Sequence, residues 1–180
     1  MNVRFREVGP ESLEQLATWL SAEPWPFHAR PRVDADWVAA RAADGSFFGD
    51  TARSFWVLDA DERTIALVRA FDLLDVTPLI DLRVASSART AGVGTAALRF
   101  MTRFVFETFP EAPRLGGYTR HDNAAMRRVF DKCGFALEAY HRESWRVEGA
   151  GYADSVGYAL LRRDWLTGTT TPGLMPASLR

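Results

Sequence analysis

One junction between a strand and a helix constrains the fold of this chain more than any other feature of its sequence. Pro78–Val84 has the apolar composition of a strand, a short connection follows, and Gly92 and Gly94 open a helix with an apolar stripe. Glycines there let the backbone approach a ligand, and the unpaired N–H groups of the first helical turn form a concave anion site. The junction therefore predicts a cradle for a diphosphate, to which Arg89 adds a charged contact.

Glycines at a helix start also occur in nucleotide-binding motifs and in tightly packed helices. The run Gly92-x-Gly94-x-x-Ala97 has the spacing of a dinucleotide-binding fingerprint, but there the first glycine ends the strand directly, whereas here about seven residues follow Val84. A triphosphate loop needs a Gly-Lys-Ser/Thr sequence, which the chain lacks. A nicotinamide-dependent oxidoreductase is therefore disfavoured. Close packing of the helix on the strand, without any ligand, stays open as the reason for both glycines.

The composition favours one globular domain. A chain of 180 residues with 47% hydrophobic residues is long enough for one sizeable core. We expect a single domain over residues 1–166 and a flexible tail over 167–180, which is rich in Thr, Pro and Gly. The other periodic patterns predict strands at Val3–Val8, Ser54–Leu58, Thr64–Phe71, Leu115–Thr119, Phe135–Val147 and Ser155–Leu161, and helices near Leu13–Leu20, at Ala35–Ala43 and from Asp122 or Asn123 to Gly134.

Charge and cysteine content exclude several classes of protein. The 22 Lys and Arg residues against 23 Asp and Glu give a net charge of -1, which provides no broad cationic field for nucleic acid or anionic lipid. No stretch resembles a signal peptide or approaches the roughly 20 apolar residues of a membrane span. The single cysteine, Cys133, excludes an internal disulfide and a cysteine metal cluster. We therefore expect a cytoplasmic protein that binds no nucleic acid, no membrane and no metal.

Two motifs occur in an order that is typical of one superfamily. The first is the helix start Arg89-x-x-Gly92-x-Gly94 after the strand Ile80-Asp81-Leu82-x-Val84. It resembles the acetyl-CoA signature of the GNAT superfamily of N-acetyltransferases. The second motif runs over residues 122–135 and resembles the asparagine-containing helix of that superfamily, which ends in Gly-Phe.

The resemblance covers roughly residues 3–165 and extends to one branch. Glu138, Arg142 and the closing stretch Asp154–Trp165 are most similar to the ribosomal-protein alanine N-acetyltransferases. Homodimers are common in that branch, so the resemblance also implies a possible homodimer.

The resemblance implies a fold and a donor substrate. The fold would be of the α/β class, mixed in the α+β sense: a strongly twisted mixed sheet of six to seven strands flanked by about four helices. The donor would be acetyl-CoA, with its pantetheine beside the strand and its pyrophosphate on the loop and helix start. The residues implied in binding it are Val84, Arg89, Thr90, Ala91, Gly92, Val93, Gly94, Thr95 and Asn123.

The implied activity is direct transfer of the acetyl group to a primary amine of a small molecule or of a protein N-terminus. The amine must be neutral to attack, and at pH 7 deprotonation costs about 4.6 kcal/mol for a lysine-like amine and about 1.4 kcal/mol for an α-amine. Asp81 is the first candidate for the base, because many members carry a glutamate at its position. Glu138 is the second, and Glu143 and His28 are further candidates.

The proton donor for the leaving thiolate is a departure from the family pattern. Members frequently carry a tyrosine on the asparagine helix, but the matching residue here is Phe130, which has no proton to give. Tyr118, Tyr140, Ser87 or solvent would have to serve. The alternative hypothesis is a non-catalytic domain that binds or senses acyl-CoA.

A loop with aromatic residues is the candidate acceptor site. Trp25, Phe27 and His28 lie among prolines in a segment that cannot form a regular element, and such loops often line pockets. We assign all three to acceptor binding. Trp25 is the tryptophan that we least expect in the core, because prolines flank it.

Overall fold

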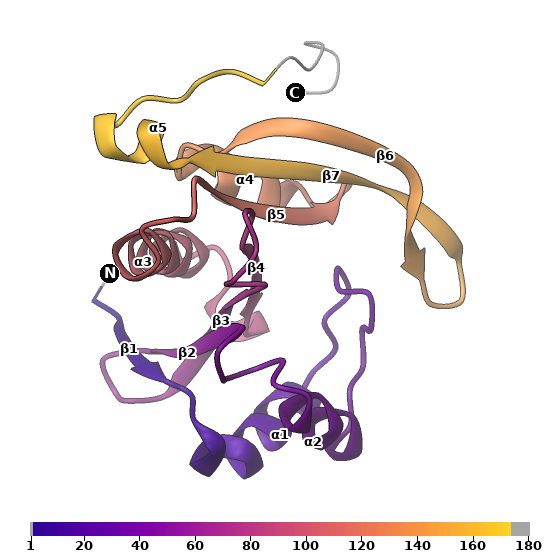
Figure 1. Cartoon of the computed structure of the whole chain (residues 1–180). Helices are drawn as coiled ribbons and strands as arrows, with labels where there is room; N and C mark the ends of the chain where they lie inside the picture. Colours follow the sequence, from indigo (N-terminus) through magenta and orange to yellow (C-terminus); the bar gives the residue numbers. More distant parts are fainter. Residues whose placement is uncertain (1, 174–180) are drawn as a thin grey trace.

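The computed structural model describes residues 2–173 and has one mixed sheet of seven strands in the order β1-β2-β3-β4-β5-β7-β6 (Figure 1). Neighbouring strands are antiparallel except β4 and β5, which are parallel. The predicted fold class is confirmed. The strands are β1 (Arg4–Glu7), β2 (Ala52–Leu58), β3 (Thr64–Phe71), β4 (Leu79–Val84), β5 (Arg114–Arg120), β6 (Ala136–Val147) and β7 (Gly151–Leu161).

Five α-helices accompany the sheet in the described part of the chain, together with two short 3-10 turns. The helix that the sequence did not predict is α5, whose six residues are too few to show a period. Strand β7 also begins four residues earlier than predicted. The helices are α1 (Leu13–Ser21), α2 (Ala35–Ala43), α3 (Val93–Thr108), α4 (Ala124–Lys132) and α5 (Arg162–Thr167), and the 3-10 turns are Pro10–Ser12 and Ser86–Ala88.

Alternate residues of the central strands pack into two separate cores. In β2, Phe55 and Val57 pack with the apolar stripe of α3, whereas Trp56 and Leu58 pack with residues of α1 and α2. Figure 1 shows α1 and α2 together at one end of the molecule and α3 apart from them. The sheet is therefore covered on both faces, which accounts for the nearly continuous burial of β2.

The parallel neighbours β4 and β5 separate toward their C-terminal ends. Their register holds one pair, Leu79 with Gly116, and the backbone N–H of Gly116 donates to the carbonyl oxygen of Pro78 at 2.9 Å. Beyond that pair the strands continue to Val84 and Arg120, and in the described structure no further residues pair between them. The divergence leaves space between the two halves of the sheet.

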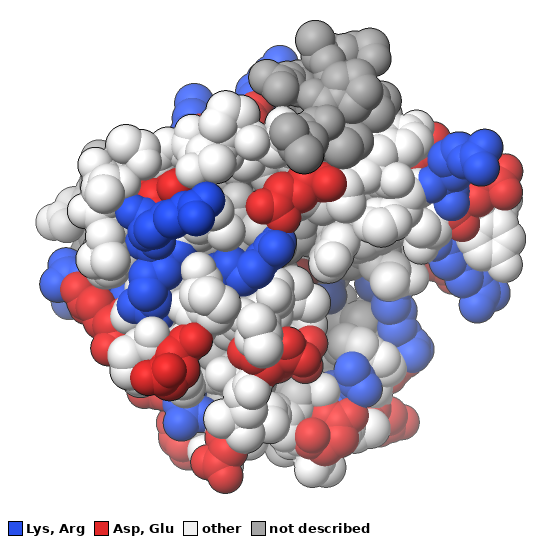
Figure 2. Space-filling model, turned by 45° about the horizontal axis from the view of Figure 1, so that its top comes forward, with Lys and Arg blue, Asp and Glu red and all other residues white. Residues whose placement is uncertain are grey.

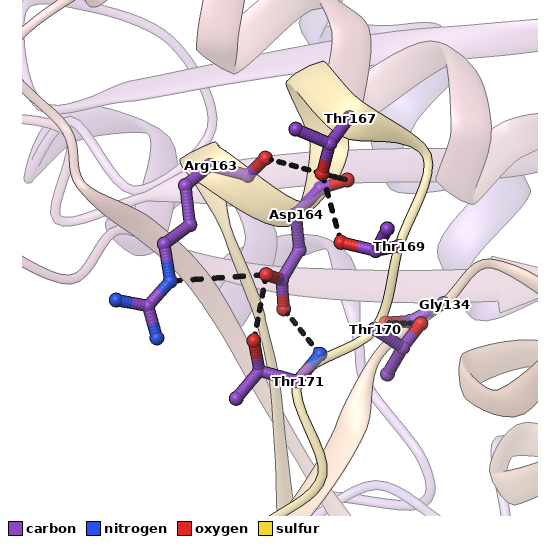
Figure 3. A network of polar contacts seen from close by, with 7 residues as sticks. All are labelled: Gly134, Arg163, Asp164, Thr167, Thr169, Thr170 and Thr171. Carbon is purple, nitrogen blue, oxygen red and sulfur yellow. Dashed lines mark hydrogen bonds and ion pairs between the residues drawn. The ribbon is translucent and has the colours of Figure 1, made fainter.

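The segment after α5 is tied back by hydrogen bonds to Asp164, a buried residue of α5 (Figure 3). Its carboxylate accepts from the backbone N–H of Thr171 at 2.7 Å and from the hydroxyl of the same residue at 2.9 Å. The hydroxyl of Thr170 donates to the carbonyl oxygen of Gly134 at 3.2 Å. The predicted tail thus begins with anchored residues, and its last part, 174–180, lies outside the described residues.

Charges of both signs are interspersed on the face drawn in Figure 2, without a large area of one sign. Among residues 2–173, no helix is long and apolar enough to cross a membrane.

Candidate active site

A cavity of about 510 Å³ lies beside the C-terminal end of β4. The loop between α1 and α2, the start of α3 and one face of α4 complete its wall, and its volume lies in the range of small-molecule sites. Of the predicted site residues, Ala91, Asp81 and Glu138 are not part of the wall. Those on the wall are Trp25, Phe27, His28, Val84, Arg89, Thr90, Gly92, Val93, Gly94, Thr95 and Asn123.

The two glycines at the helix start have different roles. Gly92 is the N-cap of α3 in the left-handed region, with φ 83°, and no side chain caps the helix. A Cβ atom at Gly92 would have no neighbour within 4 Å, so the space next to this residue is open. At Gly94 a Cβ would lie 3.2 Å from Cγ2 of Val129 and 3.5 Å from Cδ2 of Leu82. Close packing accounts for Gly94, whereas the open, uncapped helix start at Gly92 fits an anion.

The predicted charged contact, Arg89, already has protein partners in this structure. Its Nε donates to the carbonyl oxygen of Val84 at 3.2 Å, and its Nη2 lies 3.6 Å from Oε2 of Glu23. Two more cations, Arg128 and Lys132, stand on the cavity wall from α4. The wall near the helix start therefore carries several positive charges for a phosphate group.

Asn123 caps the helix that follows β5. Its Oδ1 accepts from the backbone N–H of Met126 at 3.2 Å, and its Nδ2 donates to Oγ1 of Thr119 at 2.9 Å. The side chain is thus held in place at the cavity wall. Its contact with the arm of acetyl-CoA stays a prediction.

The expectation that Trp25 lies outside the core was wrong. Its side chain is 2% exposed, packs in the core formed with α1 and α2, and donates from Nε1 to the carbonyl oxygen of Leu20 at 2.8 Å. The prolines fold the loop back on itself, since the backbone N–H of Trp25 donates to the carbonyl oxygen of Pro31 at 2.7 Å. Trp25 is nevertheless among the residues that line the cavity.

Three basic side chains surround the carboxylate of Asp81. Nε2 of His28 lies 3.0 Å from Oδ1, and Nε of Arg83 lies 3.6 Å and Nη2 of Arg69 3.9 Å from Oδ2. Arg69 is the cross-strand partner of Asp81 in the register of β3 and β4, and Arg83 lies two residues further along the same face. The sheet register and the loop between α1 and α2 together assemble the cluster.

These contacts decide the protonation state of Asp81. Burial of the carboxyl group raises its pKa, but the charge and hydrogen bond of His28 and the charges of Arg83 and Arg69 outweigh burial and hold the pKa well below its usual range. A carboxylate that ionises so readily is a weak base at neutral pH.

An ionised carboxylate only accepts hydrogen bonds, so the hydrogen in its contact with His28 belongs to Nε2. In the neutral ring the lone pair then lies on Nδ1, which is buried and has no hydrogen-bond partner in the described structure. A histidine held in this way by a carboxylate has the arrangement of a general base and its orienting group.

The second candidate base, Glu138, is not brought together with this cluster. It lies on β6 and accepts a hydrogen bond from Arg114, with which it forms an ion pair. Arg114 is the first residue of β5, whereas the cavity is lined by residues that follow the last residue of that strand, such as Asn123. Glu138 and Arg114 therefore pair at the end of β5 away from the cavity.

The residues considered as proton donors also lie off the cavity wall. Phe130 is 1% exposed and stacks on Tyr158 with ring centroids 4.7 Å apart, which makes it a core residue. Tyr140 donates to the carboxylate of Asp154, and this hydrogen bond raises the pKa of the tyrosine. Neither Tyr118 nor Ser87 reaches the wall. Among residues 2–173 no group of three or more His, Cys, Asp or Glu side chains could hold a metal ion.

Two members of the cluster, Arg69 and Arg83, are functional candidates that the sequence did not single out. The available signal was the pair Asp81 and Arg83, two charges at same-face spacing in an otherwise apolar strand. Arg69 could be connected to them only through the strand register.

The sequence matches the family described as the acetyltransferase (GNAT) domain over residues 2–136, well over half of the chain. The chain therefore belongs to the GNAT acetyltransferase family, and the predicted superfamily and enzyme class are confirmed. The ribosomal-protein alanine branch is not confirmed. The comparison with curated protein sequences gave no match.

Solved structures of the same fold include spermidine N-acetyltransferase from Vibrio cholerae. A variant of that enzyme is 15% identical with a TM-score of 0.75, and the match covers 92% of this chain and 98% of the other. A complex of the same enzyme with CoA and spermine is 16% identical with a TM-score of 0.75, covering 91% and 98%. A probable acetyltransferase is 23% identical with a TM-score of 0.71, covering 91% and 94%. These likenesses establish the fold.

Proposed function

We propose that the chain transfers the acetyl group of acetyl-CoA to the amine of a small molecule. The observation that carries the proposal is the helix start at Gly92, which has a left-handed backbone, no side-chain cap and open space in front of it, on the wall of a cavity of about 510 Å³. Oriented N–H groups and the helix dipole favour an anion there by at most about 2 kcal/mol, and the cations of the wall add to this. The complex of the spermidine N-acetyltransferase with CoA and spermine supports acetyl-CoA as the donor and a small amine as the acceptor.

In this proposal the two ends of the cavity have different tasks. Residues 89–95 hold the pyrophosphate, while Val84 and Asn123 stand beside the pantetheine arm. The amine enters at the end formed by Trp25, Phe27 and His28. Acetyl-CoA supplies the activated acetyl group as a thioester.

Acetyl transfer forms a C–N bond and breaks a C–S bond, so the amine must lose a proton and the thiolate must gain one. We assign the amine proton to Nδ1 of His28, the ring nitrogen that has no hydrogen-bond partner in the described structure, on a residue that lines the cavity. Asp81 then acts as a positioning residue, because it fixes the tautomer and the orientation of the ring and stabilises the imidazolium that forms. This role replaces that of direct base, for which its low pKa is unsuited.

Three finer hypotheses rest on the sequence alone. A protein N-terminus as acceptor follows from the alanine branch, but Glu138, which motivated that branch, pairs with Arg114 away from the cavity. A homodimer and a cytoplasmic location stay predictions. The non-catalytic alternative does not account for a carboxylate that orients a histidine of the cavity wall, one ring nitrogen of which has no partner in the described structure.

Calorimetric titration with acetyl-CoA, CoA and a nicotinamide dinucleotide tests the donor. Assays of thiol release with polyamines, amino acids and short peptides then test the acceptor. We expect both CoA forms to bind, the dinucleotide not to bind, and at least one small amine to be acetylated. Binding without turnover of any amine would favour the non-catalytic alternative, and no binding of either CoA form would refute the proposal.

A further inference from the structure

Three buried nitrogen atoms without hydrogen-bond partners belong to the side chains around Asp81. They are Nδ1 of His28, Nε of Arg69 and Nη1 of Arg83, and they come from a loop and two strands. Folded proteins satisfy nearly all buried polar groups, so unsatisfied groups in one place point to a common cause. A ligand that brings acceptors for the two arginine nitrogens and a donor, such as an amine, for Nδ1 is such a cause.

The cluster also carries more positive than negative charge. Asp81 is the acidic partner of both Arg69 and Arg83, and the described ion pairs give neither arginine a second one. The Arg83 side chain is 9% exposed and that of Arg69 17%. Burial lowers the pKa of Arg83, and Arg69 lowers it further, whereas Asp81 raises it. A buried positive charge without a counter-ion is costly, so the cluster favours an added anion.

Arg83 is the member of the pair that reaches the cavity wall. Its guanidinium lies 5.5 Å from the ring centroid of Trp25, on the side of the acceptor loop. Its neighbours on the strand, Leu82 and Val84, face the opposite way, toward Gly94 at the start of α3. Arg83 therefore belongs to the acceptor end and not to the cations near the pyrophosphate cradle.

We propose that Arg83, supported by Arg69, binds a carboxylate of the acceptor, which is therefore an amino acid or a similar amino-carboxylate. The proposal rests on the acetyltransferase function proposed above and names the class of its acceptor. Arg83 and His28 contact the two oxygens of the Asp81 carboxylate, so the two side chains lie close enough for one small molecule to reach both. Its carboxylate meets the guanidinium, and its amine, a few bonds away, meets the histidine.

The same wall is unsuited to a polyamine. Its charged residues in the described structure are all basic or histidine, and no Asp or Glu lines it. Spermidine carries several positive charges and would add to those of Arg83 and Arg69. The acceptor of this chain thus differs in charge from the polyamines named for the structural neighbours.

Matched pairs of acceptors test the proposal in the wild-type enzyme. Phenylalanine and phenethylamine, and lysine and cadaverine, differ by one carboxylate, and spermidine and phosphoethanolamine complete the set. We expect the carboxylated member of a pair to have the higher kcat/KM in the thiol-release assay. A preference for the amine without the carboxylate, for spermidine or for phosphoethanolamine would overturn the proposal.

Substitution of Arg83 tests whether this side chain binds the carboxylate of the acceptor. In Arg83→Met we expect kcat/KM to fall about tenfold to a hundredfold more for the carboxylated amine than for its partner, because hydrogen bonds to charged groups have that magnitude. Arg83→Lys keeps the charge and should retain part of the preference. Arg30→Met is the matched control, since Arg30 also pairs with an aspartate, Asp34, and lies over a tryptophan ring, but off the wall.

An equal loss for both members of a pair would assign Arg83 to the fold or to the thioester and overturn the subsite. If no amine is acetylated, the proposed function fails, and binding of phenylalanine decides the subsite separately. In the presence of CoA, phenylalanine should raise the Tm of the wild type more than phenethylamine does. No such difference, or the same difference in Arg83→Met, would overturn the subsite.

Discussion

Replacement of Gly92 by alanine tests the acetyl-CoA cradle. The left-handed backbone, with φ 83°, costs a residue with a side chain about 1–2 kcal/mol. No atom lies within 4 Å of the added Cβ, so no clash increases this cost. Alanine also restricts the unfolded chain, which offsets about 0.4–1 kcal/mol. We expect a net loss of about 1 kcal/mol and a decrease of about 2–4 °C in Tm.

Gly151 provides a control with the same backbone geometry. Its φ is also 83°, and a Cβ there has no neighbour within 4 Å, but it begins β7 and is not on the cavity wall. Gly151→Ala should therefore lose similar stability. Calorimetry should show at least a tenfold loss of acetyl-CoA affinity, about 1.4 kcal/mol, in Gly92→Ala and none in Gly151→Ala. Equal affinities in two folded variants would refute the cradle.

Outcomes are expected for three further variants, Asp81→Asn, Glu138→Gln and Asp164→Ala. Asp81→Asn should lower kcat/KM at least about tenfold, because the ring of His28 loses the carboxylate that orients it and stabilises the imidazolium that forms. The depressed pKa of Asp81 stabilises the fold above about pH 4 and ceases to do so as pH falls further, so the Tm difference between wild type and Asp81→Asn should shrink in acid. Glu138→Gln should change kcat/KM by less than about twofold, since Glu138 pairs with Arg114 off the cavity wall. Asp164→Ala should lower the unfolding free energy by about 1–3 kcal/mol in thermal melts, because buried donors lose their acceptor.

Local sequence patterns predicted most of the elements and the helix start of the site. The stripe of α3 and the cap at Asn123 are encoded within a few residues, so α3 and α4 begin where the sequence predicts. The helix start at Gly92 could also be predicted from adjacent residues, because they form a strand followed by a helix with an apolar stripe.

Properties that depend on distant residues could not be predicted. Trp25 lies among prolines, which indicated an exposed loop, but the loop folds back and buries the ring against α1. The partners of Asp81 come from β3 and from that same loop, and no spacing along the chain connects them. The sequence therefore indicated Asp81 as the first candidate for the base and His28 as a lesser one, whereas our proposal, which uses the contacts of both, assigns the base to His28.

Packing explains why α4 carries Phe130 where members of the family frequently carry a tyrosine. A Cβ at Gly117 would lie 2.8 Å from Cζ of Phe130, so this ring presses against the bare backbone of β5. A hydroxyl on Phe130 would point toward that backbone and not into the cavity. A thiol has a pKa near 8.5, so leaving as a thiolate at pH 7 costs only about 2 kcal/mol relative to the protonated product. Deprotonation costs about 4.6 kcal/mol for a lysine-like amine and about 1.4 kcal/mol for an α-amine, so an acceptor of the first kind depends more on a base than on an acid. In the proposed mechanism His28 and Asp81 supply that base, and solvent protonates the thiolate.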